Sequence, residues 1–304
     1  MLSEKPWKLE AIARLLIGVF ICMCAGSLFG TALYPGTGFQ KHKTIFFVLA
    51  VLSLLLFAGA LFELGKAWTL ENFRRRAGIV FACFYPGLML LAWAQQLAGA
   101  PATTHLVGQM LIGLVSLQGA VLLLTWRMLR QQQITWDQAF GFSEHWVRAI
   151  VFGILVAGIF LPIGNVIQGF CDHLMRQPYF PVKPVEQQAV QTLRTASSMA
   201  GRLAAAFFTI AVAPVGEEML FRGILYPTIK KAGFPKLALW VTSLAFAAIH
   251  ANVEIFLPLL VLALLLTLLY EKTNNLLAPI TAHAVFNTVQ LIALYIKEQQ
   301  MSMN

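Results

Sequence analysis

Charged residues are scarce in this chain. Only 12% of its 304 residues are Asp, Glu, Lys or Arg, whereas soluble domains carry about 25%. The alternating ten-residue strands of a membrane β-barrel are also missing. The four cysteines form no Cys-x-x-Cys pair, so we expect them to fill the core as small apolar side chains. The first apolar run lacks a convincing small-residue cleavage site, and we therefore expect no cleavable signal peptide.

Several catalytic motifs are absent as well. The sequence has no His-Glu-x-x-His helix, no Gly-x-Ser-x-Gly elbow, no pair of aspartates within apolar segments and no phosphate-binding glycine loop. These absences argue against the usual zinc-protease helix, an α/β-hydrolase, an aspartyl intramembrane protease and a nucleotide-binding enzyme.

Apolar residues are abundant and come in blocks long enough to cross a bilayer. They make up 59% of the chain, and the mean hydropathy is +0.73. The sequence therefore predicts an all-α, polytopic transmembrane helix bundle of about 8–9 spans. The apolar blocks lie at roughly 15–34, 44–65, 78–98, 105–126, 148–170, 199–215, 237–251, 255–270 and 276–296. The last part is ambiguous, because 237–270 also reads as a broken pair around Pro258.

The net charge of +9 indicates membrane topology rather than nucleic-acid binding, because the basic residues lie between apolar blocks. If nine segments cross, fifteen of the 22 Lys and Arg residues fall on the side of the N-terminus. The positive-inside bias then predicts a cytoplasmic N-terminus and an external C-terminus. We expect an integral protein of the bacterial plasma membrane. The sequence does not indicate its oligomeric state.

The chain divides into two parts by the specificity of its motifs. We expect residues 1–130 to form an N-terminal transmembrane region of about four helices. The motifs that could carry chemistry all lie in residues 131–304. Within the second part, residues 131–147 mix polar residues with Trp and Phe, which favours a segment at the membrane surface.

The first motif is Glu217-Glu218-x-x-x-Arg222. In a helix Glu218 and Arg222 are four residues apart and can form an ion pair, while Glu217 projects about 100° away. Pro214 is expected to end one helix and open another, which would place both carboxylates in a first turn. A helix start at the membrane boundary would account for this motif without any function.

The second and third motifs are Phe246-x-x-x-His250 and His283-x-x-x-Asn287. Each pair shares a helix face. Polar groups inside apolar helices indicate a functional site by default, although a core histidine or an interhelical hydrogen bond is the plainer alternative for each motif alone. Together, the motifs supply what a hydrolase needs: Glu and His to activate water, and His and Asn to stabilise an oxyanion.

These three motifs resemble the signatures of the CPBP family, the Rce1-like or Abi intramembrane proteases related to CAAX prenyl endopeptidases. The resemblance covers about 131–297 and no comparable match precedes it. It implies that Glu217 and His250 activate water, that His283 and Asn287 stabilise the oxyanion, and that Glu218, Arg222 and Phe246 support the site. The implied substrate is a membrane-associated, prenylated or tagged peptide.

The resemblance leaves the chemistry open between a glutamate-type protease without cofactor and a metalloprotease. The candidate ligands of a single zinc are Glu217, His250 and His283. A non-proteolytic scaffold or bacteriocin-immunity member of the same family is the alternative function. A transporter using the same polar groups is a further one, although no internal repeat supports it.

Overall fold

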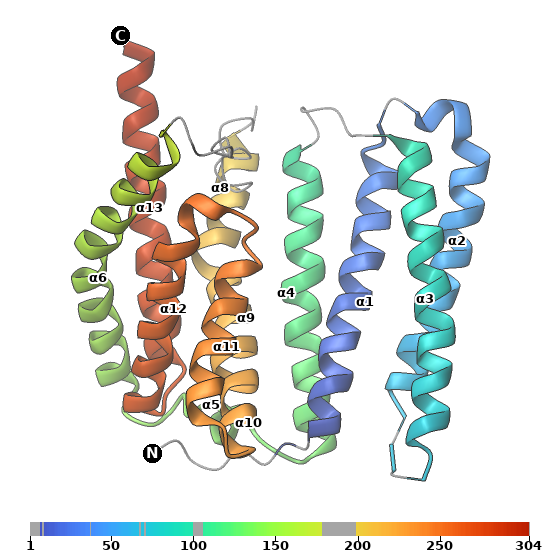
Figure 1. Cartoon of the computed structure of the whole chain (residues 1–304), viewed down its shortest axis with the longest axis horizontal. Helices are drawn as coiled ribbons and strands as arrows, with labels where there is room; N and C mark the ends of the chain where they lie inside the picture. The colour runs from blue at the N-terminus through green and yellow to red at the C-terminus, as the bar shows by residue number, and fades with distance from the viewer. Residues whose placement is uncertain are drawn as a thin grey trace. The chain divides into compact units, whose positions relative to one another are not determined.

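The computed structural model describes residue 7 and residues 9–36, 38–66, 68–69, 71–99, 106–177 and 199–303 (Figure 1). These residues form helices and no strand. The first helices are α1 (Leu9–Leu33), α2 (Phe39–Leu64), α3 (Phe73–Ala98), α4 (Leu106–Gln131), α5 (Trp136–Phe140) and α6 (Trp146–Met175). After them come α8 (Met199–Phe207), η2 (Phe208–Val212), α9 (Ala213–Glu218), η3 (Met219–Leu225), α10 (Tyr226–Lys231), α11 (Pro235–Ala248), α12 (Val253–Thr273) and α13 (Leu277–Met303). The expected all-α class is confirmed.

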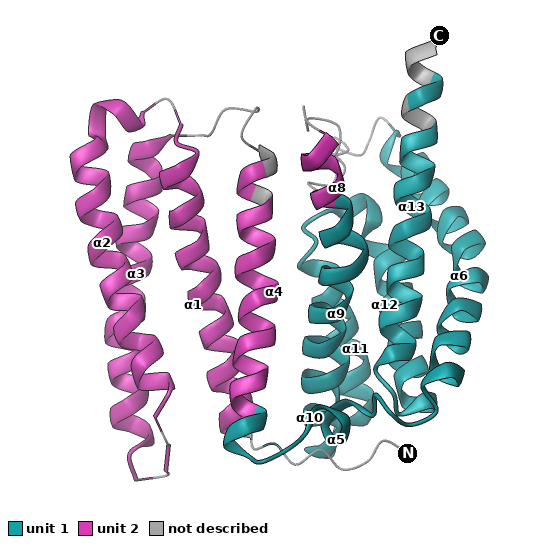
Figure 2. Ribbon diagram, turned by 180° about the vertical axis from the view of Figure 1, so that it is seen from behind, with its two compact units in different colours: residues 1–7, 129–191, 206–304 teal, residues 8–128, 192–205 magenta. Residues whose placement is uncertain are grey.

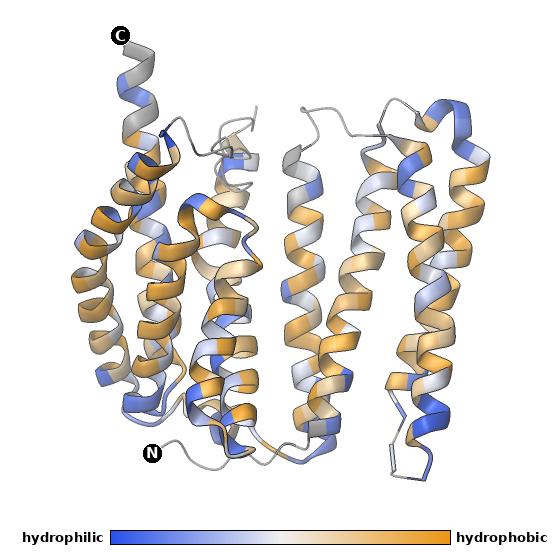
Figure 3. Cartoon of the chain, in the orientation of Figure 1, coloured by the Kyte–Doolittle hydropathy of each residue, from blue (hydrophilic) through white to orange (hydrophobic). Residues whose placement is uncertain are grey.

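Eight helical segments are long and apolar enough to cross a membrane. They are Glu10–Leu33, Phe39–Leu64, Phe73–Ala98, Leu111–Gln131, Trp146–Met175, Met199–Lys231, Val253–Thr273 and Leu277–Ile296. Apolar residues cover most of their length (Figure 3). Many large apolar side chains stay exposed, for instance Leu55 (64%), Phe62 (70%) and Val166 (73%). Soluble monomers rarely expose apolar surface on this scale. The chain is therefore an integral multi-pass membrane protein.

The predicted block 237–251 corresponds to the short helix α11. Its 14 residues extend about 21 Å, less than the roughly 30 Å of a hydrocarbon core. The break before the next helix lies at residues 249–252, whereas Pro258 sits inside α12. The interpretation of a pair broken at Pro258 was therefore wrong. The predicted orientation assumed nine crossings and stays a prediction.

The described residues fall into two compact units (Figure 2). Unit 1 takes those of 1–7, 129–191 and 206–304, and unit 2 takes those of 8–128 and 192–205. The predicted division into an N-terminal transmembrane region, 1–130, and a motif-bearing core, 131–304, stays a prediction.

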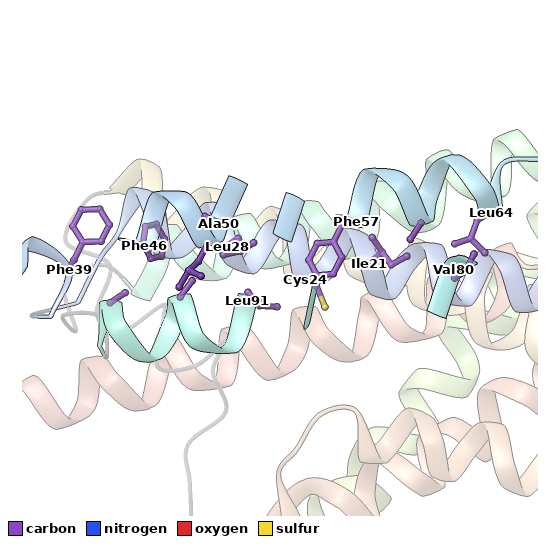
Figure 4. Close-up of a cluster of buried hydrophobic side chains, with 14 residues drawn as sticks. Ile21, Cys24, Leu28, Phe39, Phe46, Ala50, Phe57, Leu64, Val80 and Leu91 are labelled. Carbon is purple, nitrogen blue, oxygen red and sulfur yellow. The ribbon is translucent and has the colours of Figure 1, made fainter. Parts of the chain in front are cut away.

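Unit 2 has a core between α1, α2 and α3, in which Phe46 and Phe57 are almost fully buried (Figure 4). Helices α2 and α3 approach closely at Gly87, where a Cβ would lie 2.8 Å from the Phe57 ring. The Ser53 hydroxyl donates to the Gly87 carbonyl oxygen at 2.8 Å. A small residue and a buried hydroxyl thus hold two apolar helices together, as is common within membranes.

Unit 1 packs α6 against α12 and α13 around a core that includes Phe160, Phe246 and Leu266. At Gly153 of α6, a Cβ would lie 2.6 Å from the Ala278 carbonyl oxygen of α13. Because a backbone atom cannot move aside as a side chain can, this crossing requires glycine. It fixes the position of α13, which carries the third motif.

The short helix α5 is held at the end of unit 1 where α12 turns into α13. Thr135 and Gln138 form a capping box at its start, and Gly141 ends it with a φ of 72°. The Leu276 N–H donates to the Phe140 carbonyl oxygen at 2.9 Å. A Cβ on Gly223 of η3 would lie 2.6 Å from the Phe140 ring. Helix α5 therefore packs against η3 at Gly223, the residue that directly follows the first motif. The predicted membrane-surface position of 131–147 stays a prediction.

Candidate functional site

The first motif lies in the middle of one long helical stretch. Residues 199–231 stay helical throughout, and the two π-helical turns η2 and η3 flank α9 on either side. Pro214 stands at the start of α9, but the residues next to it keep helical backbone angles. The expected break at Pro214 was therefore wrong. The wider turn of η2 accommodates the missing proline N–H, and such π-turns often occur at functional sites.

Glu218 and Arg222 form the predicted ion pair, which is fully buried. Arg222 Nη1 donates to Glu218 Oε1 at 2.7 Å, and the side chains are 1% and 0% exposed. Helix α12 supplies the other partners of the guanidinium: Nη2 donates to the Ala263 carbonyl oxygen at 3.0 Å, and Nε donates to Thr267 Oγ1 at 3.4 Å. Each nitrogen of the Arg222 guanidinium thus has a partner, as a buried ion pair requires, whereas Glu218 Oε2 is buried without a hydrogen-bond partner among the described residues.

Phe246 contacts residues of all three motifs. Its ring lies 4.5 Å below the Arg222 guanidinium carbon and packs edge-on against Phe221 at 5.3 Å. It also contacts the rings of His250 at 5.0 Å and His283 at 5.6 Å. The aromatic face stabilises the buried cation, and the same ring packs against both imidazoles.

His283 is buried and forms a hydrogen bond with Glu218. Its Nδ1 lies 2.9 Å from Glu218 Oε1, and the side chain is 4% exposed. Because a carboxylate only accepts, Nδ1 carries the hydrogen, which leaves Nε2 with a lone pair in the neutral imidazole. That nitrogen lies 3.9 Å from Glu217 Oε2. This separation is too long for a direct hydrogen bond and short enough for a bridging water.

Glu217 has surroundings unlike those of Glu218. Its side chain is 15% exposed, against 0% for Glu218. Among the described residues, none donates a hydrogen bond to the Glu217 carboxylate, and no ion pair joins it to His250. The nearer imidazole is therefore that of His283. Glu217 remains the less constrained carboxylate of the pair.

His250 follows directly after α11 and is partly buried. Its Nδ1 lies 2.7 Å from the Phe246 carbonyl oxygen, so Nδ1 carries the hydrogen and Nε2 has the lone pair. The turn is tight, since the next residue, Ala251, has a φ of 48°. Asn252 then caps α12 through hydrogen bonds to the N–H groups of Glu254 and Ile255.

Asn287 lies one turn beyond His283 on α13. Its Nδ2 donates to the Thr209 carbonyl oxygen of η2 at 2.9 Å, which leaves a second N–H on the same nitrogen. The carbonyl of Thr209 lies within a π-turn. The third motif thus contacts both sides of the first: His283 bonds to α9, and Asn287 bonds to the turn that precedes it.

The sequence-predicted residues therefore gather around one buried pair. Direct contacts connect Glu218, Arg222, Phe246, His250 and His283, Glu217 faces His283, and Asn287 is anchored to η2. Sequence reasoning missed Thr267 and the Ala263 carbonyl. A hydroxyl inside the apolar run of α12 was the available signal for Thr267, whereas a backbone carbonyl leaves none.

The predicted ligand set for a metal can be compared with this geometry. Within the described part of the chain, no group of three or more His, Cys, Asp or Glu side chains is close enough to hold a metal ion. The two donors that face each other are Glu217 Oε2 and His283 Nε2. The described geometry therefore does not assemble the set Glu217, His250 and His283 as metal ligands.

Comparison with known proteins identifies the segment that carries this cluster. Residues 199–289 match the family described as Type II CAAX prenyl endopeptidase Rce1-like, and they contain all three motifs. Residues 199–289 form an Rce1-like domain. The resemblance expected over 131–297 is thus confirmed over these residues.

The chain is also similar to two bacterial proteins. It is 39% identical over 87 residues to the uncharacterized protein YpbD of Bacillus subtilis. The matched stretch covers 27% of this chain and 41% of that protein. It is 31% identical over 77 residues to the UPF0177 protein YxdF of Lactococcus lactis. This second match covers 25% of this chain and 42% of that protein. The matches span about two fifths of the length of these relatives. No solved structure matches the chain.

Proposed function

We propose that this chain is an intramembrane endopeptidase that hydrolyses a peptide bond of a membrane-associated, prenylated or tagged substrate. The observation that carries the proposal is the placement of Glu217 beside His283, 3.9 Å apart, within an Rce1-like domain. The buried ion pair of Glu218 and Arg222 supports this arrangement, because Glu218 also contacts His283. We propose a bacterial plasma membrane as its location.

Glu217 is the proposed general base. A water between Glu217 Oε2 and His283 Nε2 would attack the scissile carbonyl carbon, and Glu217 would take its proton as the new C–O bond forms. The C–N bond then breaks, and the leaving amine takes the proton back from Glu217. The products are a carboxylic acid and an amine, and the enzyme returns to its starting state.

His283 is proposed to position the attacking water. Its Nδ1–H bond to Glu218 fixes the ring orientation, in the way that a carboxylate orients a catalytic imidazole elsewhere. The bare Nε2 accepts a hydrogen bond from the water. This assignment differs from the expected pairing of Glu217 with His250, and it follows from the shorter separation to His283.

Asn287 is the proposed donor to the oxyanion. Both imidazoles carry their hydrogen on Nδ1, which is already engaged, so each can donate through Nε2 only when protonated. Asn287 has an N–H to spare after its bond to Thr209 and needs no protonation. We propose that His250 accepts a hydrogen bond from substrate or water through Nε2.

Comparing cells that express the wild type or one of three variants tests the function. The variants Glu217→Ala, His250→Ala and His283→Ala should insert normally and fail to generate the peptide products that appear with the wild type. The readout is quantitative mass spectrometry of membrane proteins and released peptides. Identical peptide profiles for wild type and Glu217→Ala would contradict proteolysis and favour a scaffold.

A further inference from the structure

Basic side chains from three helices meet at one end of unit 2, where α2 finishes. Arg14 of α1 donates through Nη1 to the carbonyl oxygens of Lys66 at 2.7 Å and Leu64 at 3.5 Å. Arg127 of α4 donates through Nη2 to the Gly65 carbonyl oxygen at 3.2 Å. These carbonyls belong to the last residue of α2 and the two residues after it, so the arginines cap the end of that helix.

One carboxylate lies at the centre of this cluster. Glu63 is 7% exposed at its side chain and accepts from Lys66 Nζ at 2.5 Å and from Arg76 Nη1 of α3 at 2.9 Å. The indole N–H of Trp68 donates to the Glu63 carbonyl oxygen at 3.2 Å. Both carboxylate oxygens of Glu63 are therefore occupied by cations.

The cluster has more positive charge and more donors than its own groups satisfy. Arg14 lies within electrostatic range of Arg76 and Arg127, and Glu10 is the further carboxylate near it. Four cations, including Lys66, thus face two carboxylates. The Nε atoms of Arg14 and Arg76 are buried and have no hydrogen-bond partner among the residues that the structure describes. Like charges brought together with unfilled donors are what a bound anion would stabilise.

The place of the cluster indicates which anion is available. It lies where the apolar helices of unit 2 end, next to Phe62, whose ring is 70% exposed and carries Lys66 Nζ 4.4 Å above it. Arg74 and Arg75 are exposed beside it on α3 and extend the positive surface. At the end of a membrane-crossing helix, the abundant anionic groups are the phosphates of lipid headgroups.

We propose that Arg14, Arg76 and Arg127 bind the phosphate of an anionic phospholipid headgroup, with Lys66 and Glu63 setting their positions. Guanidinium groups recognise phosphate through paired N–H donors, and three of them from three helices would enclose it. Bound lipid would then join α1, α3 and α4 at this end. The residues of this site all belong to unit 2 and lie outside the matched range 199–289 in the sequence.

Native mass spectrometry of the full-length protein in detergent tests the site. The protein is titrated with phosphatidylglycerol or with phosphatidylcholine of the same acyl chains. Phosphatidylglycerol should bind at least about fivefold more tightly, and Arg14→Gln and Arg127→Gln should each weaken it by about fivefold. The matched control is Arg148→Gln, which removes one positive charge from unit 1, where Arg148 stacks on Phe152.

Each outcome bears on the proposal. Equal binding of the two lipids, or binding unchanged in Arg127→Gln, overturns it. Equal weakening in Arg148→Gln overturns it too, because the effect would then be one of net charge. Displacement of phosphatidylglycerol by millimolar inorganic phosphate would assign the site to a soluble phosphate instead. Should Arg14→Gln fail to fold, the exposed Arg127 still provides the test, with thermal melting as the check on its fold.

Discussion

Glu217 and Glu218 are neighbours in the sequence, but their surroundings differ. Glu218 is enclosed by Arg222 and His283, and its charge is matched within the protein. Glu217 is 15% exposed and lies 3.9 Å from His283 Nε2. A carboxylate that reacts needs an accessible oxygen, and one that positions others needs fixed partners. The two residues are therefore suited to different tasks, which can be separated by mutation.

We predict that Glu217→Gln loses activity without losing stability. Removal of a general base should lower the cleavage rate by about 10²–10⁴-fold. The free energy of unfolding should change by no more than about 0.5 kcal/mol, because no described residue bonds to this carboxylate. Cleavage assays and thermal unfolding of the purified protein measure the two effects.

The matched variant Glu218→Gln should, in contrast, lose stability. It leaves the buried Arg222 without a counter-charge, and breaking such a pair costs about 3–5 kcal/mol of unfolding free energy. Equal melting temperatures for the two variants would show that the glutamates are not divided between a reacting and a supporting role.

We predict that a chelator leaves the proteolytic activity unchanged. The described residues do not bring the three candidate ligands together, and the proposed mechanism takes its base and its donor from Glu217 and Asn287. The test is dialysis against 1,10-phenanthroline followed by a cleavage assay. Loss of activity that added zinc restores would replace this mechanism with a metal-dependent one.

The elements of the site are positioned by close helix crossings. Helix α13 carries both His283 and Asn287, and α6 fixes it at Gly153, where the Ala278 carbonyl leaves no room for a Cβ. Helix α12 supplies the partners of Arg222. The geometry of the first and third motifs thus depends on two helices that carry no motif themselves.

We predict that Gly153→Ala destabilises the protein by about 1–3 kcal/mol, because the added methyl group meets backbone 2.6 Å away. The control is Gly158→Ala on the same helix, where a Cβ would meet no atom within 4 Å. That change should be neutral or stabilise the helix by up to about 1 kcal/mol. Similar melting temperatures for the two variants would mean that α6 and α13 do not cross as described.

How much the sequence could predict depends on the range of the interaction. Helical spacing alone predicted the ion pair of Glu218 and Arg222, because both residues lie on one helix. The bond from His283 to Glu218 was not predictable, since it depends on how α13 is rotated against α9. The continuity of the helix through Pro214 was missed as well, because π-turns have no recognised sequence signal.

At the scale of the whole molecule, the central question is which end faces the cytoplasm. The basic residues predict that the N-terminus and the end bearing Arg76 and Arg127 are cytoplasmic. Short loops connect α11 to α10 and to α12, and these consecutive helices lie side by side (Figure 1). The side of the C-terminus then depends on α11, which is shorter than a full span.

We predict that single cysteines report this orientation in a variant without the four native cysteines. Lys41→Cys, at the start of α2, should react with a membrane-impermeant maleimide added outside intact cells. Gln131→Cys, at the end of α4, should react only after the cells are opened. Both positions are exposed. The reverse pattern would invert the topology and move the proposed lipid site to the outer leaflet.

The most direct test of the account is whether water, activated at Glu217, ends up in the product. Membranes containing the wild type or Glu217→Gln are incubated with membrane substrates in ¹⁸O-labelled water, and the released peptides are analysed by mass spectrometry. We predict that wild-type products carry ¹⁸O at one new C-terminal carboxylate and that Glu217→Gln produces none of them. Labelled products at equal levels in both samples would contradict the assignment of Glu217 as the base.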